Sequence, residues 1–312
     1  MTKQRNYMLN SPHLYSVFFA PRGNSRMLQL GMQIAQQYLN PEDKLIGIIG
    51  EAGAGKSMLI KGMFPGLDLC NDDSGVNIRP LPILDVDEDV GFYAPHTYHM
   101  DVRFESAFTQ MHVLAECTEK AIKKGRRVII EHFELLYPFL KTNAQLLIGV
   151  GEEVIITRPN LFGPLPVDIA ETVHKSVHYR KMAHTAEDLV EHCMPKELFE
   201  KCYHGDIRRG FSLGFKEKPD IDIERLKRDV KEYIAQDLPV SFFDEDHVKI
   251  GGLVHPCTGP RIHVRTTGEI ENFRLLKEVF YDSMHEMYLI IGLVGERWDV
   301  EIRDLNRIKV MG

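Results

Sequence analysis

The chain has few cysteines and no long apolar segment. Its five cysteines form no C-x-x-C pair and show no regular spacing, which argues against a disulfide framework and for a reducing compartment. The first residues lack the apolar stretch of a signal peptide. The apolar run MYLIIGLVG near the end is far shorter than the roughly 20 residues of a membrane helix. We therefore expect a cytoplasmic protein with no membrane partner.

Internal repeats and low-complexity tracts are also absent from the sequence. The 312 residues are 44% hydrophobic and 27% charged, which is typical of a soluble globular protein long enough for two domains. The net charge of −7 means that the chain as a whole does not attract nucleic acid. Contact with RNA would need a local basic patch, such as residues 123–127 or 225–231, and both clusters are also typical of a solvated helix face.

Strands alternate with helices in the first half of the chain. The spacing of apolar residues predicts helices over 24–39, 56–63 and 105–125. Apolar runs predict strands at residues 15–20, 44–50, 97–103, 126–133, 144–151 and 152–159. This alternation is typical of an α/β layer with a largely parallel sheet.

Residues 159–166 contain three prolines and a glycine, which indicate a domain boundary. The predicted domains are therefore residues 1–163 and 164–312. Beyond the boundary, helices near 178–194 and 220–236 precede four extended segments, LPVSFF, HVKIGGLV, RIHVRTTGEI and MYLIIGLVG. Helices separated from strands favour an α+β domain. The predicted fold class is an α/β nucleotide-binding domain followed by an α+β domain.

One segment matches the pattern G-x-x-x-x-G-K-[ST] and lies between a predicted strand and a predicted helix, where a nucleotide site requires it. In such a loop, glycines let backbone N–H groups turn inward, and the helix N-terminus adds partial positive charge. Lys56 would contact the β- and γ-phosphates, and the hydroxyl of Ser57 would bind Mg²⁺. This phosphate loop consists of Gly50, Glu51, Ala52, Gly53, Ala54, Gly55, Lys56 and Ser57.

Two carboxylates stand at or near the ends of apolar runs, Asp101 in YHMDV and Glu131 in VIIEHF. Ligands of open parallel sheets bind at the carboxyl ends of the strands, so we expect both residues to converge on the phosphate loop. Asp101 would then hold the Mg²⁺ shell, and Glu131 would orient a water molecule. The alternative is that either residue only pairs with a nearby Arg or Lys.

The first half of the chain resembles the small P-loop ATPase subunit of the bacterial tRNA threonylcarbamoyladenosine-forming machinery. The resemblance lies in the helix before the first buried strand, the phosphate loop, and the segments YHMDVRF and VIIEHFE. The resemblance covers roughly residues 24–135 and implies binding of ATP and Mg²⁺ and hydrolysis of ATP. On that pattern Asp101 is the magnesium-linked aspartate and Glu131 the catalytic glutamate. His132 stands where the family has Trp, and Ser57 replaces the usual Thr, so a nucleoside-kinase-like P-loop protein remains open.

In the second half, His184, Asp188 and His192 are spaced at i, i+4 and i+8, on one face of a predicted helix. Residues four apart on a helix can bind one metal ion from adjacent turns. Cys257 and His263 could complete a tetrahedral site. The alternative is that these belong to the ordinary surface or core histidines among the 14 in the chain.

The segments HTAEDLVEHC, DLPV and CTGPRIHVRTTGEI are similar to the second additional (editing) domain of threonyl- and alanyl-tRNA synthetases and their free-standing relatives. The similarity covers most of residues 178–280 and implies zinc binding and hydrolysis of mischarged aminoacyl-tRNA. Asp188 replaces the second histidine of the family's H-x-x-x-H, and the motif from Cys257 to His263 is longer by two residues. The resemblance thus implies a zinc set of His184, Asp188, Cys257 and His263. We expect this domain to recognise a tRNA end, an amino acid or a nucleotide rather than to catalyse editing.

Together the two halves predict an ATPase whose nucleotide state controls an editing-like domain that engages tRNA or aminoacyl-tRNA. One alternative is a small-molecule kinase, because editing-like domains also occur joined to uridine-kinase-like proteins. Asp68, Asp72 or Asp73 would then act as the base. The other alternative is a non-catalytic binding protein gated by the nucleotide.

Overall fold

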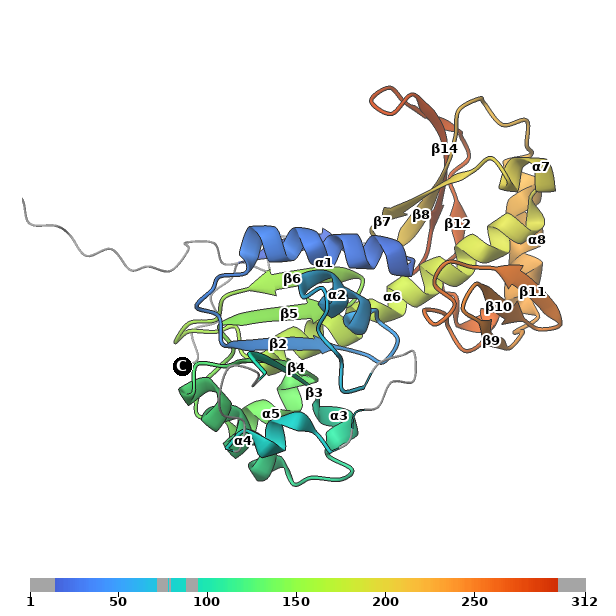
Figure 1. The fold of residues 1–312 in the computed structure, drawn as a ribbon. Coiled ribbons are helices and arrows are strands. Elements are labelled where there is room, and N and C mark those ends of the chain that lie inside the picture. Colours follow the sequence, from blue (N-terminus) through green and yellow to red (C-terminus); the bar gives the residue numbers. More distant parts are fainter. Residues whose placement is uncertain (1–14, 72–77, 79, 88–94, 297–312) are drawn as a thin grey trace, which may run out of the picture.

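The computed structural model describes residues 15–71, 78, 80–87 and 95–296 (Figure 1). Its first sheet has six strands in the order β1-β6-β5-β2-β4-β3. β5, β2, β4 and β3 pair in parallel, whereas β6 and β1 are joined to them by antiparallel pairing. The strands are β1 (Ser16–Phe19), β2 (Leu45–Gly50), β3 (Thr97–Asp101), β4 (Arg127–Glu131), β5 (Leu146–Val150) and β6 (Glu153–Thr157).

Helices cover both faces of this sheet. Alternate residues of β2 point to opposite sides, and all of them are buried because both sides are covered. Ile46 and Ile48 pack with α1 and α2, whereas Leu45 and Ile49 belong to the core beneath α4, α5 and α6. The helices of this part are α1 (Asn24–Tyr38), α2 (Lys56–Met63), α3 (Val102–Glu105), α4 (Met111–Lys123) and α5 (Phe133–Leu136), with short 3₁₀ turns η1 (Pro82–Asp85) and η2 (Tyr137–Phe139).

The strand predicted over 97–103 ends at Asp101, and the helix predicted over 105–125 begins only at Met111. Both predicted elements are present with shorter bounds, and the end of the strand has a local cause. The Oδ1 atom of Asp101 accepts a hydrogen bond from the N–H of Phe104 over 3.1 Å, which caps the one-turn helix α3. Asp101 is therefore an N-cap as well as the last residue of its strand.

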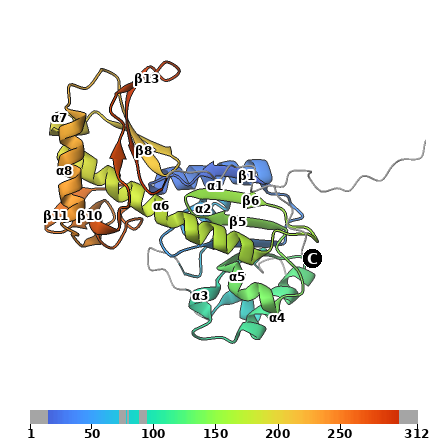
Figure 2. The same cartoon turned by 180° about the vertical axis from the view of Figure 1, so that it is seen from behind.

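α6 (Pro166–Cys193) is a single helix that runs from the six-stranded sheet to α8 and the smaller sheets (Figure 2). Ile169 and Val173 in its first half belong to the core under the six-stranded sheet, and Ala186 and Leu189 in its second half belong to a separate core. The sequence predicted only the second half, near 178–194. The two halves bury different faces against different partners, so no single apolar stripe runs along the helix. The division into domains at 163/164 stays a prediction.

The second core lies between α6, α8 and two antiparallel sheets. The strands of the segment YHGDIRRGFSLGF were missed, because its glycines interrupt the apolar alternation. RIHVRTTGEI, which we expected to be extended, is a loop with one 3₁₀ turn. The sheets are β12-β14-β8-β7, with β13 paired to β14, and β11-β10-β9. The elements are α7 (Lys196–Phe199), β7 (Tyr203–Ile207), β8 (Gly210–Phe215), α8 (Ile223–Ala235), β9 (Val240–Asp244), β10 (His247–Ile250), β11 (Leu253–Pro256), η3 (Thr267–Glu269), β12 (Arg274–Leu275), β13 (Phe280–Asp282) and β14 (Met287–Leu293).

Within the ranges that the structure describes, no helix is both long and apolar enough to cross a membrane.

Candidate functional site

The phosphate loop turns between the end of β2 and the start of α2, so the predicted strand and helix on either side of it are confirmed. Gly53 and Gly55 have φ angles of +76° and +93°. This left-handed conformation costs most side chains energy but glycine very little. The glycines of the pattern therefore stand where the backbone needs them, and Gly55 is also the N-cap of α2.

Lys56 is the first residue of α2 and is 5% exposed. Its Nζ donates a hydrogen bond to the carbonyl of Glu51 over 2.9 Å and lies 3.5 Å from Oε2 of Glu131. The ammonium group thus lies between the phosphate loop and the end of β4. A cavity of about 340 Å³ opens there, and it is lined by Lys56, Ser57, Asn71, Asp101, Arg103 and Glu131 among others.

The structure brings Asp101 and Glu131 together, since the two residues are register partners at the ends of the parallel strands β3 and β4. The side chain of Asp101 is held in place by the N–H of Phe104 and by the amide of Asn71, which donates to Oδ2 over 3.0 Å. Asn71 and Arg103 complete this side of the cavity, and sequence reasoning missed both. Arg103 stands two residues after Asp101 in YHMDVR, and that proximity was the available signal.

Glu131 is held as a carboxylate by His99. The N–H of Cys70 donates to Nδ1 of His99 over 3.0 Å, so Nε2 of the ring carries the hydrogen and donates to Glu131 Oε1 over 3.1 Å. Burial alone would raise the pKa of Glu131, but this hydrogen bond and the charge of Lys56 outweigh burial and lower the pKa. An ionised carboxylate at this position can accept a hydrogen bond from a water molecule.

Of the three aspartates considered as a kinase base, Asp68 is exposed and does not line this cavity. Asp72 and Asp73 lie outside the described residues.

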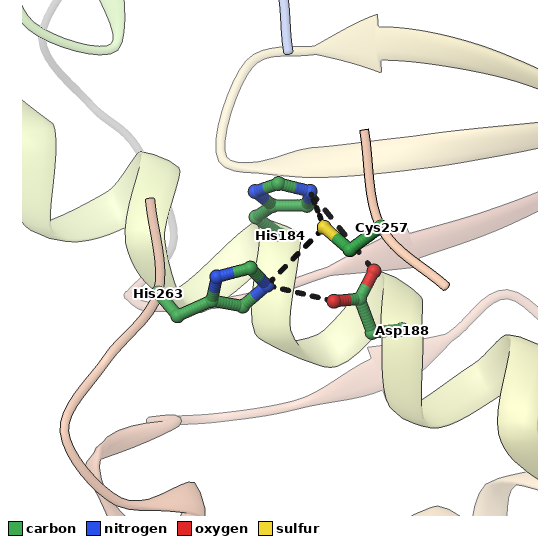
Figure 3. A group of neighbouring side chains, drawn as sticks. All are labelled: His184, Asp188, Cys257 and His263. Carbon is green, nitrogen blue, oxygen red and sulfur yellow. Dashed lines mark hydrogen bonds and ion pairs between the residues drawn. The ribbon is translucent and has the colours of Figure 1, made fainter. Parts of the chain in front are cut away.

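A second group of side chains, the four-residue cluster, consists of His184, Asp188, Cys257 and His263 (Figure 3). His184 and Asp188 lie on adjacent turns of α6, Cys257 directly follows β11, and His263 lies on the loop after it. Their potential ligand atoms all lie within 4.8 Å of one another. The four residues named from the sequence therefore lie together in space, whereas His192 points instead to Tyr233, with its Nε2 3.1 Å from the hydroxyl.

Both histidines of the cluster present Nε2 to its centre. Nδ1 of His184 donates to the carbonyl of Ile262 over 3.0 Å, and Nδ1 of His263 donates to the carbonyl of Pro260 over 3.2 Å. Nε2 of His184 therefore carries a lone pair, as in metal-binding histidines. Nε2 of His263 donates a hydrogen bond to Oδ2 of Asp188 over 2.7 Å, and it would have to release that hydrogen to bind a metal ion. Both carbonyls belong to the segment between Cys257 and His263, so this segment orients both rings.

The distances in the cluster fit a zinc ion. Bonds of about 2.0 Å to nitrogen and 2.3 Å to sulfur give tetrahedral edges of about 3.3 to 3.6 Å. Nε2 of His184 lies 3.3 Å from the sulfur of Cys257, and Nε2 of His263 lies 3.8 Å from it. Asp188 is closer, with Oδ2 only 2.7 Å from Nε2 of His263, because these two groups contact each other directly.

Without a metal ion, the protonation of His184 suits a cation, whereas that of Cys257 does not. Burial, and next the charge of His263, lower the pKa of His184 well below its usual value, so the ring is neutral. Burial and the charge of Asp188 raise the pKa of the Cys257 thiol. A bound metal ion would have the opposite effect on the thiol, because it stabilises the thiolate.

The two candidate sites lie against each other. Nη1 of Arg180, one turn before His184 on α6, donates to the carbonyl of Ala54 in the phosphate loop over 3.0 Å. Lys181 forms an ion pair with Glu51. A Cβ atom on Gly53 would lie 3.2 Å from the carbonyl oxygen of Arg261, in the loop that carries His263. Sequence reasoning missed Arg180, although it has the same four-residue spacing as His184 and Asp188.

No family model and no curated protein matches the chain. The chain is similar to two solved structures of ornithine aminotransferase from Toxoplasma gondii. One is 10% identical with a TM-score of 0.25, over 80% of this chain and 67% of the aminotransferase. The other is 9% identical with a TM-score of 0.22, over 80% and 68%. Similarity this low carries no argument about fold or activity.

Proposed function

We propose that the protein hydrolyses ATP and couples its nucleotide site to an editing-like, zinc-holding domain that engages tRNA or aminoacyl-tRNA. The observation that carries the proposal is the contact between the two sites. Arg180 binds the carbonyl of Ala54 from the helix that supplies His184 and Asp188. A rearrangement of the phosphate loop on nucleotide binding would therefore act on two residues of the cluster through one rigid helix.

In this proposal the chain contributes positioning and charge. Backbone N–H groups of the loop and the Lys56 ammonium would bind the β- and γ-phosphates, and the Ser57 hydroxyl and the Asp101 carboxylate would hold Mg²⁺. Magnesium, when bound, neutralises charge on the phosphate oxygens. The carboxylate of Glu131 accepts a hydrogen bond from the water whose oxygen attacks the γ-phosphorus. The bond to the bridging oxygen of ADP breaks, the water oxygen and its hydrogens become part of inorganic phosphate, and this phosphate gives up a proton to solvent on release.

The four-residue cluster would hold zinc through two imidazoles, one thiolate and one carboxylate, and the zinc ion would act there as a Lewis acid toward an oxygen atom. Asp188 in place of histidine leaves the donor set compatible with zinc, because carboxylate oxygen is a zinc ligand. The role proposed for this domain is recognition of a tRNA end or its aminoacyl group, with editing itself not required.

The test is phosphate release from Mg·ATP by the wild type, by Lys56→Ala and by the control Lys175→Ala, each with and without bulk tRNA. Lys175 is an exposed cation on α6, outside both basic clusters, and should not matter. We expect turnover that Lys56→Ala abolishes and that tRNA changes. Turnover that ignores tRNA would contradict the coupling to tRNA. Tight ATP binding without turnover would contradict the hydrolase and favour a nucleotide-gated binding protein.

A further inference from the structure

A second group of potential metal ligands lies directly beside the four-residue cluster. A cavity of about 290 Å³ borders His184, Asp188 and Cys257, and Glu191 also lines it. Glu191 follows Asp188 by three residues on α6 and is 5% exposed. Its Oε2 lies 3.3 Å from Nε2 of His255, a buried residue of β11.

Glu191 is paired differently from two neighbouring carboxylates, the buried Glu187 and the partly buried Asp206. Glu187 lies 2.9 Å from Arg22, and Asp206 receives hydrogen bonds from Arg22 and Arg26, so these two carboxylates have permanent cations as partners. The ion-pair partners of Glu191 within the described part of the chain are imidazoles. Oε2 faces His255, and Oε1 lies 3.0 Å from Nδ1 of His204 without receiving a hydrogen bond.

Burying a carboxylate is costly unless a cation or several hydrogen bonds compensate it. A carboxylate between imidazoles is also the usual composition of a site for a borderline divalent ion. One ligand atom each of Asp188, Glu191 and His255 lie within 4.8 Å of one another, and all three residues are buried. Asp188 belongs to this group and to the four-residue cluster, and its two carboxylate oxygens allow it to serve both.

We propose that Asp188 is shared by two zinc ions, one held with His184, Cys257 and His263 and the other with Glu191 and His255. This inference rests on the zinc site of the proposed function and extends it to a centre of two metal ions. Such a centre can bind two oxygen atoms of one substrate, as an ester or phosphate group would provide. The substrate class that such a centre would take in the adjoining cavity is therefore an acyl or phosphoryl compound.

Glu191, Cys202 and His204 form another close group, but it fits a second ion less well. Glu191 faces Nδ1 of His204, whereas the sulfur of Cys202 lies 3.9 Å from Nε2 on the other side of the ring. His204 and Cys202 are also more exposed than His255. We therefore assign the second ion to Asp188, Glu191 and His255.

The test measures how many zinc ions the full chain binds. The protein is loaded with Zn²⁺, excess metal is removed, and the bound zinc is measured by elemental mass spectrometry. We expect about two ions per chain in the wild type and about one in His255→Ala. His285→Ala removes an exposed histidine of the turn after β13 and should keep both ions. Cobalt loading shows whether His255→Ala remains folded. The sulfur-to-cobalt charge-transfer band of Cys257 should persist in that variant and disappear in Cys257→Ser.

One zinc ion per chain in the wild type, unchanged by His255→Ala, would overturn the proposal. A second ion that is lost in Cys202→Ala but kept in His255→Ala would overturn the assignment of its ligands. ATP turnover is measured separately. Two zinc ions without ATP turnover would contradict the proposed ATPase and support the two-ion centre. ATP turnover with one zinc ion would support the ATPase and contradict the two-ion centre.

Discussion

Nη1 of Arg180 donates a hydrogen bond to the carbonyl oxygen of Ala54 over 3.0 Å, which joins α6 to the phosphate loop. The guanidinium is buried and binds two further carbonyls, those of Pro21 and Gly151. Burial, and next the charge of Arg22, lower the pKa of Arg180 to about 10, so it stays charged near neutral pH. A charged group held by backbone carbonyls will respond when the phosphate loop moves.

Replacing Arg180 should uncouple the two sites. If zinc and ATP communicate through this residue, removing zinc from the wild type should change ATP affinity about fivefold or more. In Arg180→Lys the difference should shrink toward none, because a lysine ammonium cannot reach three carbonyls in a fixed fork. Calorimetric titration with ATP, with and without zinc, measures the ATP affinity of each protein. The control is Lys175→Ala, which changes an exposed residue on the same helix. An unchanged zinc effect in Arg180→Lys would rule out this route.

Glu131→Gln should separate nucleotide binding from turnover. The low pKa of Glu131 means that the wild type acts as a carboxylate, and the amide has the same shape without the charge. We expect ATP binding to persist and phosphate release to fall by about 100-fold or more. Equilibrium binding and phosphate release, measured on the same preparation, test this. Glu116→Gln on the exposed face of α4 is the control. Equal losses of binding and turnover would mean that Glu131 only supports the loop.

The half of the candidate site around the phosphate loop could be predicted from the sequence because its geometry is local. The phosphate loop is one contiguous pattern, and the parallel pairing of β3 with β4 places Asp101 beside Glu131. Sequence reasoning missed His99, although it lies two residues before Asp101 and so on the same face of β3. The rule that ligands gather at the carboxyl ends of strands was sufficient only to bring Asp101 and Glu131 together.

The rest depended on contacts between distant segments. Arg180 and Ala54 are far apart in sequence, and no local pattern indicates that one binds the carbonyl of the other. The full length of α6 was hidden because its two halves are buried against different cores. His255 is one of several histidines, and only the pairing of β11 with β10 and its position over α6 bring it to Glu191.

Gly53→Ala should weaken the contact between the phosphate loop and the loop that carries His263. A Cβ atom there would lie 3.2 Å from the carbonyl of Arg261, at a φ of +76°. Gly66→Ala is the matched control, because its φ is +84° but nothing lies within 4 Å of its Cβ position. Both variants should lose about 1 kcal/mol of stability from the backbone.

Only Gly53→Ala should also weaken ATP binding and change zinc affinity. Chemical unfolding gives the stability, and titrations with ATP and Zn²⁺ give the two affinities. If Gly66→Ala altered both affinities as strongly, general destabilisation would explain the result.

Glu152 should make the protein less stable as pH rises from about 4.5 to about 7. Burial, and next the charge of Glu153, raise the pKa of Glu152 to about 7, although its Oε1 accepts a hydrogen bond from the N–H of Arg209. Over this range the folded chain keeps a proton that the unfolded chain has released. The folded state then binds more protons, so the free energy of unfolding decreases with pH and levels off above 7.

Glu152→Gln removes this titration but retains an acceptor for Arg209. The unfolding free energies of the wild type and of Glu152→Gln are measured in urea at pH 5 and at pH 8. Relative to the variant, the wild type should lose about 1 to 3 kcal/mol of stability between pH 5 and pH 8. The same comparison with Glu200→Gln, an exposed carboxylate after α7, should show no shift. A difference that stays constant with pH would mean that Glu152 is ionised in the folded protein, with its charge compensated by Arg208 and Arg209.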